Sequence, residues 1–358
     1  MKTKVVIVFA LVVIGLLSYI WYFEQTNDIS QNDSNIIQHA KHFQIHKTDN
    51  GYVLVDGATR KLDINYDRNS ITIPAKRLVL FSSTHAAFLD SLNQTEKIVG
   101  VAWANSYDWY IPRIQNGFEN ETIKDIGTAD NPSYDVITSL KPDLVVLVGG
   151  TGMWENHAKK LEEIGISYVV VSEWIEEEPL GKLEWIKFFG FLTGSQDIAE
   201  KIFEETKNKA EKIAEKTKSK EKPSILWAGV FNGIAFVPRT QTYAVNAIID
   251  ANANYVFSDL NGTGTATISL EELLVRAKNA QIMVYTSAFV NHTDQITSQY
   301  PVLAKSLPIQ ECNMYSFQPW YWQSTADYDL FAADMAAIAH PDTFPDHQLK
   351  LFQKAECN

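Results

Sequence analysis

The chain has 358 residues, of which 46% are hydrophobic and 21% are charged, and this balance is typical of a folded globular protein. A single hydrophobic core rarely grows beyond about 250–300 residues, so the length predicts two lobes or domains. The formal net charge of -12 argues against nucleic acid as a partner, because nucleic-acid binding needs a basic surface.

The first predicted element is an apolar segment at the N-terminus. Lys2 and Lys4 precede an uncharged run, Val5–Phe23, which is about as long as a membrane-spanning helix. The lysines before the run and the acidic residues after it predict that the bulk of the chain lies outside the membrane. The run ends in aromatic residues, so residues 1–24 are expected to be an uncleaved anchor, with a cleaved signal segment as the alternative. No cysteine follows the run, which argues against a lipid-modified cysteine.

Residues 25–75 are predicted to form a polar tether followed by a β-hairpin extension. The tether is assigned to the polar, Asn-rich residues 25–40. An Asp-Asn-Gly turn then separates two strand-like segments, which is a strong hairpin pattern. Strands are predicted on both sides of this turn and before Pro74, at 43–46, 52–55 and 70–73.

Residues 76–181 alternate short apolar strands with helices. Strands that are apolar along their whole length are typical of a parallel sheet covered on both faces. This region is therefore predicted to be an N-terminal α/β lobe. Its strands are expected at 77–81, 98–101, 144–148 and 168–171, and its helices at 86–92, 134–140 and 155–163.

Residues 182–222 are predicted to be a helical linker, and residues 223–358 a C-terminal lobe that repeats the α/β alternation. The predicted fold is α/β, with two lobes that each hold a mostly parallel sheet flanked by helices, joined by one long helix. Such a crossing limits hinge motion, and the cleft between the lobes is the expected ligand site. In the second lobe, strands are expected at 225–227, 234–237, 282–285 and 314–317, and helices at 244–251, 270–277 and 328–339.

The two cysteines, Cys312 and Cys357, do not form a Cys-x-x-Cys pair, so a structural zinc site is not supported. Outside the cytosol they could form a disulfide that holds the C-terminal tail, and two free thiols are the alternative. The sequence lacks the Gly-x-Ser-x-Gly, His-Glu-x-x-His and P-loop patterns, so no catalytic residue, resident cofactor or protein-bound metal is expected.

Candidate ligand-binding residues lie where strands end, because open α/β sheets bind ligands at the carboxyl ends of their strands. His85 is expected at a helix N-terminus just after a strand, and Arg239 could neutralise an anionic ligand. For these two residues the alternative is an ordinary surface position, and for the aromatic residues it is packing. Aromatic residues in or near strand-end loops predict a pocket for a large, flat ligand; they are Trp103, Tyr107, Trp109, Trp154, Trp174, Trp227, Phe231, Trp320 and Trp322.

Several long segments resemble one family, the ABC-importer binding proteins for ferric siderophores, cobalamin and haem, whose lobes are joined by a single helix. The resemblance covers residues 76–339. It rests on KRLVLFSSTHAAFLDSLNQTEKIVGVAW, IKDIGTADNPSYDVITSLKPDLVVLVGG, KLEEIGISYVVVSEW, FFGFLTGSQDIAEKI and ANANYVFSDLNGTGTATISLEELLVRAKNAQIMVY.

The resemblance implies a monomeric, non-enzymatic binding protein on the outer face of the cytoplasmic membrane, either anchored or secreted. It would bind a ferric siderophore, haem or corrinoid and deliver it to an ABC permease. In that family, one acidic residue on each lobe docks onto arginines of the permease. By position in the motifs these are Asp135 and Glu271, although the first position more often holds the longer Glu.

Two alternatives come from other functional classes. The two-lobed fold also resembles that of metal-cluster oxidoreductase subunits, which need cysteines in their strand-end loops. Both cysteines of this chain lie near its C-terminus, which argues against that enzyme class. The other alternative is a membrane-anchored scaffold or adhesion protein, against which the aromatic residues near the strand ends argue.

Overall fold

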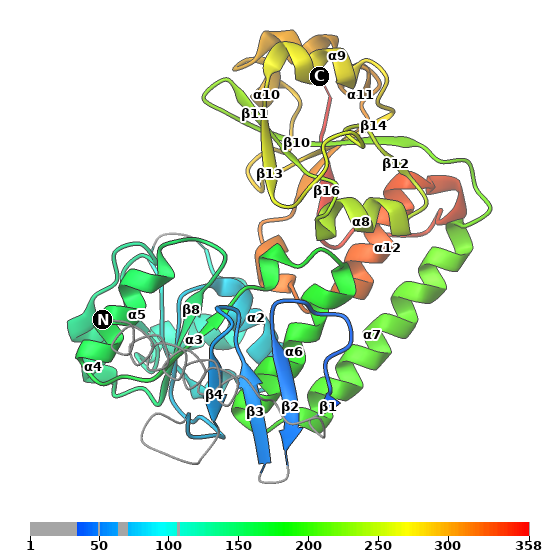
Figure 1. Cartoon of the computed structure of the whole chain (residues 1–358). Helices are drawn as coiled ribbons and strands as arrows, with labels where there is room; N and C mark the ends of the chain where they lie inside the picture. Colours follow the sequence, from blue (N-terminus) through cyan, green and yellow to red (C-terminus); the bar gives the residue numbers. More distant parts are fainter. Residues whose placement is uncertain (1–33, 49–50, 64–70, 106–107, 358) are drawn as a thin grey trace, which may run out of the picture.

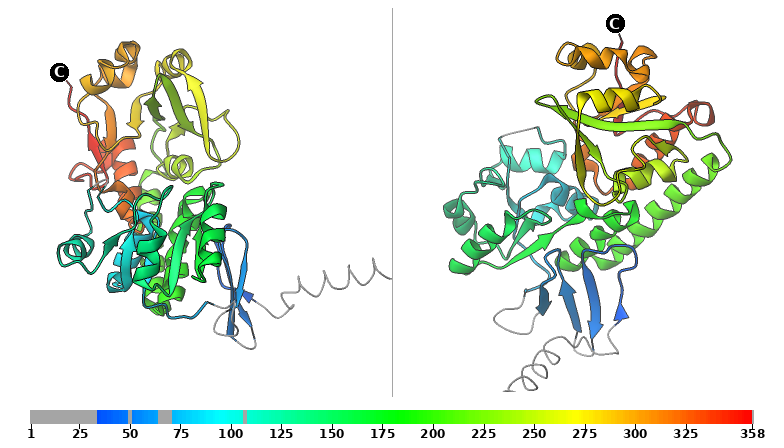
Figure 2. Two further views of the ribbon diagram at one scale, coloured as in Figure 1. Left: turned by 90° about the vertical axis from the view of Figure 1, so that its left-hand side faces the viewer. Right: turned by 45° about the horizontal axis from the view of Figure 1, so that its top comes forward.

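The structure, a computed structural model, describes residues 34–48, 51–63, 71–105 and 108–357. Two α/β lobes are stacked on each other, and a small antiparallel sheet from the N-terminal segment packs against the first lobe (Figure 1). Figure 2 shows the same arrangement from two other sides. The predicted α/β class with two lobes is confirmed.

The first lobe contains a five-stranded sheet in the order β7-β6-β5-β8-β9, and all its strand pairs are parallel. Valine, leucine and isoleucine fill the strands because helices cover both sheet faces. Its strands are β5 (Leu78–Leu80), β6 (Ile98–Val101), β7 (Lys124–Asp125), β8 (Leu144–Val148) and β9 (Tyr168–Val171). Its helices are α2 (Ser83–Ser91), α3 (Pro112–Glu119), α4 (Tyr134–Leu140) and α5 (Trp154–Glu163), with short η1 (Thr95–Lys97) and η2 (Glu173–Ile175).

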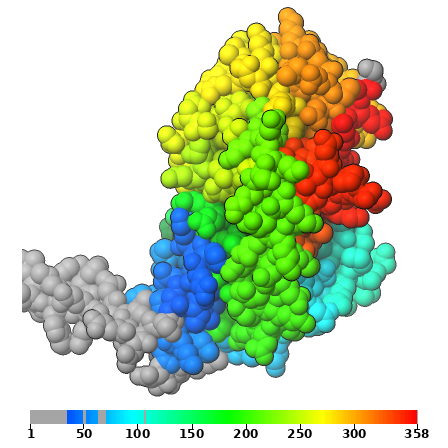
Figure 3. All heavy atoms as spheres, turned by 90° about the vertical axis from the view of Figure 1, so that its right-hand side faces the viewer, coloured from blue at the N-terminus to red at the C-terminus, as the bar shows by residue number. Residues whose placement is uncertain are grey.

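The connection between the lobes consists of two helices, α6 (Pro179–Thr193) and α7 (Gln196–Thr217). Gly194 ends α6 in the left-handed conformation with φ 77°, which glycine adopts without a Cβ clash. Helix α6 is apolar on nearly all sides and buried in the first lobe. Helix α7 alone crosses to the second lobe, where it packs against α12 (Tyr328–Ala339). Figure 3 shows α7 as a green column that reaches both lobes.

The second lobe has a mixed sheet in the order β13-β11-β10-β14-β15-β16, with β12 paired to β10. The pairs of β10 with β12 and β14, and of β14 with β15, are parallel, whereas β11, β13 and β16 run antiparallel to their neighbours. Its strands are β10 (Ser224–Phe231), β11 (Ile234–Pro238), β12 (Asn254–Tyr255), β13 (Thr265–Ser269), β14 (Ile282–Tyr285), β15 (Met314–Phe317) and β16 (Phe352–Lys354). Besides α12, its helices are α8 (Tyr243–Asp250), α9 (Leu270–Ala277), α10 (Asp294–Thr297) and α11 (Leu307–Gln310), with short η3 (Pro301–Lys305), η4 (Tyr321–Ser324) and η5 (Pro341–Thr343).

A disulfide joins Cys312 to Cys357, with their Cα atoms 5.8 Å apart. It ties Cys357, three residues beyond the end of β16, to the turn that follows α11. Of the two alternatives left open by the sequence, the structure therefore has the disulfide.

The N-terminal extension forms a four-stranded antiparallel sheet, and the predicted hairpin corresponds to two of its strands, β2 and β3. Of the further strand predicted at 70–73, Ser70 lies outside the described residues and Ile71 is a single bridge residue. The strands of this sheet are β1 (Ser34–Asn35), β2 (Gln44–Thr48), β3 (Gly51–Val55) and β4 (Lys61–Asp63).

Residues 38–42, whose first part was assigned to the tether, are held instead by two buried carboxylates of the first lobe. Glu184 accepts hydrogen bonds from the main-chain N–H groups of residues 38–40, at 2.7–3.2 Å. Glu176 accepts from those of residues 41 and 42, at 2.9 and 3.0 Å. Residues 38–42 and the two glutamates are more than a hundred residues apart in the sequence, so no local pattern reveals this contact.

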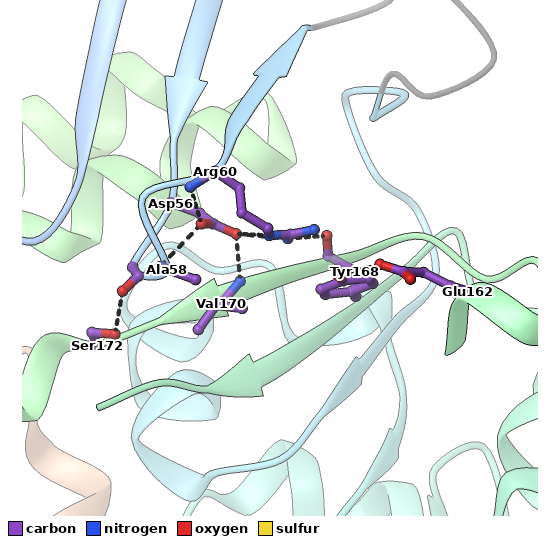
Figure 4. Close-up of polar contacts among 8 residues, drawn as sticks. Asp56, Ala58, Arg60, Glu162, Tyr168, Val170 and Ser172 are labelled. Carbon is purple, nitrogen blue, oxygen red and sulfur yellow. Dashed lines mark hydrogen bonds and ion pairs between the residues drawn. The ribbon is translucent and has the colours of Figure 1, made fainter. Parts of the chain in front are cut away.

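The loop between β3 and β4 covers the β9 edge of the first-lobe sheet (Figure 4). The N–H of Gly57 donates to the carbonyl of Val170 at 2.8 Å, and the N–H of Val170 donates to the buried carboxylate of Asp56 at 3.0 Å. The Arg60 guanidinium donates to the same carboxylate at 2.7 Å and lies 3.9 Å from the ring centre of Tyr168. The extension is therefore part of the first lobe and satisfies an edge strand that would otherwise be open.

The predicted anchor at residues 1–24 lies outside the described residues. From Ser34 onward, in the described ranges, no helix combines the length and apolarity needed to cross a membrane.

Candidate functional site

A cleft of about 960 Å³ lies between the two lobes. A volume of this size is at the upper end of the range for small-molecule sites. The first lobe lines it with Phe81, Ser82, Ser83, Trp103, Ala129, Val148, Thr151 and Met153. The second lobe lines it with Gly229, Val230, Phe231, Phe236, Tyr285, Thr286, Ser287, Ala288, Phe289, Val290, Gln299, Phe317, Pro319, Trp322 and Gln323.

The cleft lies where the parallel strands of both lobes end. Phe81 follows β5, Trp103 follows β6, and Val148 is the last residue of β8. In the second lobe, Phe231 and Phe317 end β10 and β15. The carboxyl ends of parallel strands form the usual ligand side of an open α/β sheet. The cleft therefore faces the ligand-binding side of both sheets at once.

Several aromatic side chains of the second lobe are exposed to the cleft. Phe289 is 87% exposed and Phe231 is 67% exposed, although both are large apolar residues. Trp322 and Phe236 are also exposed and line the same space. Exposed apolar side chains grouped in a concave site indicate a surface that a ligand covers.

Of the candidate ligand-binding residues, Trp103, Phe231 and Trp322 line the cleft. Phe289, Phe236, Met153 and Tyr285 were missed. Phe289 could have been found, because it lies in the loop just after the predicted strand 282–285, where other aromatic residues were selected. Phe236 could not, since it lies within β11 and faces outward by the alternation of that strand.

Three candidates are packed away from the cleft. Trp227 lies in the middle of β10 and contacts Phe317 and Phe352 in the core, because β10 continues to Phe231. Trp109 is buried against Phe118, with ring centres 6.0 Å apart.

His85 is the third of these and is fully buried below the N-terminus of α2. Its ring lies 5.7 Å from that of Phe189, and its Nε2 lies 4.0 Å from a carboxylate oxygen of Glu173. Burial lowers the pKa of His85 to about 3 and raises the pKa of Glu173. His85 is therefore uncharged near neutral pH, so this contact is not an ion pair.

Four further candidates lie outside the cleft lining. The indole N–H groups of Trp174 and Trp320 donate to the carbonyls of Gly149 and Lys350, each at 2.9 Å. The Arg239 guanidinium donates to the carbonyl of Asn261 at 3.1 Å. Trp154 begins α5 and packs on the hydrophobic cluster of the first lobe, and Tyr107 lies outside the described residues.

The side chain of Gln323 joins the two lobes at the floor of the cleft. Its amide N–H donates to the carbonyl of Asp108 at 2.9 Å, and its amide oxygen accepts from the N–H of Tyr110 at 2.7 Å. Because Gln323 belongs to η4 of the second lobe, these bonds hold residues 108–110 of the first lobe against the second.

The polar groups that line the cleft are uncharged. They are hydroxyls and amides, such as those of Ser83, Thr151, Thr286 and Gln299. In the described parts of the chain, no group of three or more His, Cys, Asp or Glu residues is arranged to hold a metal ion. Such a cleft can bind a ligand by stacking and by neutral hydrogen bonds.

The two candidate docking carboxylates occupy equivalent places on the two lobes. Asp135 is the second residue of α4 and Glu271 the second residue of α9, and both are exposed. Each helix begins with a serine cap, since Ser133 accepts from the N–H of Val136 and Ser269 from that of Glu272. An acid in the first turn is also favoured by the helix dipole.

Comparison with known proteins adds three findings. A family model described as periplasmic binding protein matches residues 78–305. An uncharacterized lipoprotein of Methanocaldococcus jannaschii is 29% identical over 303 residues, which cover 83% of this chain and 72% of that protein.

Two solved structures share the fold. A periplasmic heme-binding protein from Pseudomonas aeruginosa has a TM-score of 0.62 and 17% identity, with 79% of this chain and 98% of that chain covered. The molybdate periplasmic binding protein of a Haemophilus influenzae ABC transporter has a TM-score of 0.63 and 15% identity, with 83% and 94% covered. Since these two proteins are named for different ligands, the shared fold does not specify a cargo.

Proposed function

The chain belongs to the periplasmic binding protein family, and from this premise we propose that it captures a bulky metal chelate between its lobes and delivers it to a membrane permease. Proteins of this family are non-enzymatic solute-binding components of ABC transporters. The proposed cargo is a ferric siderophore, haem or a corrinoid. The observation that carries the proposal is the cleft of about 960 Å³, with aromatic side chains exposed toward it.

The size and the lining of the cleft favour a large cargo over a simple ion. An oxyanion or a bare metal ion is held by a small shell of converging charged or polar ligands. Here the exposed side chains of Phe231, Phe289 and Trp322 line an open space and offer apolar surface to a ligand. A ligand with an extended apolar or aromatic surface would cover them and gain about 25 cal/mol for each Å² of apolar surface removed from water.

Binding can be tested with the full-length chain in detergent micelles. Titration with a ferric siderophore, haem or a corrinoid is expected to quench tryptophan fluorescence, because Trp103 and Trp322 line the cleft, without chemical change of the ligand. Phe289→Ala is expected to weaken binding roughly tenfold through loss of a covered aromatic face. The matched control is Val275→Ala, an exposed apolar residue on α9 outside the cleft lining. Absence of quenching by every such ligand would contradict the cargo class.

We further propose that Asp135 and Glu271 dock the two lobes onto the permease. Carboxylates at equivalent exposed positions suit this role because each can take paired hydrogen bonds from an arginine. The double variant Asp135→Arg, Glu271→Arg is expected to abolish uptake of the cargo and to leave its affinity for the purified protein unchanged. The control is Glu163→Arg with Glu311→Arg, which makes the same charge change on exposed residues of both lobes. Normal uptake by the first double variant would rule out this docking assignment.

The protein is proposed to work on the outer face of the cytoplasmic membrane. The relative from Methanocaldococcus jannaschii carries the name of a lipoprotein, which supports attachment to a membrane. In this chain the attachment is assigned to the apolar run Val5–Phe23 rather than to a lipid-modified cysteine, because no cysteine follows that run. Membrane fractionation of cells that express the tagged chain, with and without residues 1–24, tests this assignment.

A further inference from the structure

We infer that the cleft selects a metal complex that has no net charge and a complete coordination shell of its own. This inference rests on the proposed function and narrows its cargo. Among the described residues that line the cleft, none is an Asp, Glu, Lys, Arg, His or Cys. The contrast with the rest of the molecule is large, because charged residues make up 21% of the chain.

The absence of charge in the described lining works against charged cargo. An ion that leaves water for a mostly apolar site loses hydration energy, and it binds well only if an opposite charge or several hydrogen bonds replace that energy. Haem carries two carboxylates, and a ferric tris-catecholate carries a triple negative charge. Arg239, the one basic candidate, lies outside the lining, and its guanidinium donates to the carbonyl of Asn261.

The described lining also lacks a suitable ligand for an open metal coordination site. Tyr285 has the one phenol hydroxyl there, and it donates to the carbonyl of Val230 at 3.2 Å and accepts from the N–H of Val230 at 3.3 Å. Burial raises the pKa of Tyr285, which disfavours the phenolate that ferric iron would need. Met153 offers a thioether, but this soft, neutral donor is a poor partner for a hard ferric ion.

The side chains one layer below the cleft lining are also poorly placed to hold a charge. Ser83 lines the cleft, and the next residue, Thr84, donates a hydrogen bond of 2.6 Å to the buried carboxyl of Glu173. Glu173 faces His85, and burial raises the pKa of the Glu173 carboxyl and lowers the pKa of the His85 imidazole to about 3. Both shifts oppose a charge beneath the lining.

The groups that do line the cleft suit an uncharged complex with a polar rim. Hydroxyls and amides can pair with the amide, oxime or hydroxamate oxygens of such a ligand, and the aromatic faces can cover its apolar body. Two chemical sources meet this description, a neutral ferric trihydroxamate and a corrinoid. The cleft-lining residues with such groups are Ser83, Thr286, Ser287 and Gln299, whereas the Ser82 hydroxyl bonds Thr84 and the Thr151 hydroxyl is buried.

The experiment compares four probes by calorimetric titration of the full-length chain in neutral detergent. They are a neutral ferric trihydroxamate, cyanocobalamin, a ferric tris-catecholate and haem. At least one of the two uncharged probes is expected to bind about 100-fold more tightly than either charged probe, since an unpaired charge would have to be desolvated. The affinity of that probe is expected to stay constant between low and high salt, because no charge pair is screened.

The absorption spectrum of the bound probe provides a second measurement. It is expected to match that of the free complex, because no protein atom enters the coordination shell. Equal or tighter binding of the tris-catecholate or haem, or a shifted metal absorption band of the bound uncharged probe, would overturn this inference and leave the proposed function standing. If none of the four probes binds, the proposed function itself is wrong, and the narrower inference fails with it.

Discussion

The two lobes follow the same strand–helix alternation but complete their sheets in different ways. The first sheet is entirely parallel, and its β9 edge is covered by residues 56–60 of the N-terminal extension. The second sheet has antiparallel strands at both edges, and a disulfide ties the segment that follows β16 to the turn before β15. The first lobe thus depends on a segment from outside its α/β repeat, whereas the second closes itself.

The lobes also contribute differently to the cleft. The first lobe provides two aromatic residues, Phe81 and Trp103, whereas the second provides most of the aromatic surface. A ligand would therefore stack chiefly on the second lobe, while hydroxyl groups line the cleft from both lobes. The two lobes thus share the polar lining but differ in their aromatic surface.

The largest expected effect is a loss of stability in the first lobe. Asp56→Ala removes a buried carboxylate that accepts from the N–H groups of Ala58, Arg60 and Val170 and from the Arg60 guanidinium. Because these donors and the guanidinium lose their partner, the free energy of unfolding is expected to fall by about 4 kcal/mol. Denaturant unfolding measures the loss, and hydrogen exchange is expected to quicken in β9 well before β15.

The control for this prediction is Glu121→Ala. Glu121 is exposed and its carboxylate pairs with the exposed Lys124, so its removal is expected to change stability far less than the loss of Asp56. Equal protection of β9 in the Asp56 variant and the native chain would show that the extension does not support the first lobe.

The second prediction concerns the second lobe. Replacing both Cys312 and Cys357 by serine removes a link between residues 45 apart in the sequence, and the expected loss is about 3 kcal/mol. Here the faster hydrogen exchange is expected in β15 and β16, with β9 unchanged. The native chain under reducing conditions should behave in the same way. A uniform loss of protection across both lobes would contradict the separation of the lobes.

The smallest expected effect is a pH dependence from the first lobe. In the unfolded chain His85 binds a proton near pH 6.5, but in the folded chain only near pH 3. Between these values the unfolded state holds more protons, so the folded state loses stability as the pH falls, by about 1.4 kcal/mol between pH 7.5 and pH 5.5. Unfolding of His85→Leu at both pH values should lack this loss. Glu173, whose pKa is raised, acts in the opposite direction, so the difference between variant and native chain isolates His85.

The sequence predicted the elements whose signals are local. Helix α9 with its Ser269 cap and helix α12 have the expected bounds, and the apolar strands of both sheets lie where they were expected. The antiparallel edge strands β13 and β16 were missed because neither is a continuous apolar run. The attachment of residues 38–42 was missed because its partners, Glu176 and Glu184, are more than a hundred residues away.

The cleft was predictable as a region but only partly as a set of residues. Of the residues chosen by the strand-end rule, Trp103, Phe231 and Trp322 line the cleft. It failed for Trp227, because β10 extends four residues beyond its predicted end and encloses this tryptophan. It failed for His85 because this third residue of α2 points into the core. Ser83, two positions earlier on the same helix, lines the cleft instead. Such one-residue rotations depend on packing and leave no pattern in the sequence.

Glu176, which follows η2, and Glu184 of α6 also determine where a mechanical load would travel. A pull on the chain ahead of Ser34 would pass first through the pairing of β1 with β2 and then through the five main-chain N–H groups that bond Glu176 and Glu184. The force would pass into the base of the first lobe and α6, which continues through Gly194 into the crossing helix α7. The sheet ends that form the cleft lie off this path. A force applied at the N-terminal end of the described chain would therefore load the first lobe and α7 without deforming the cleft.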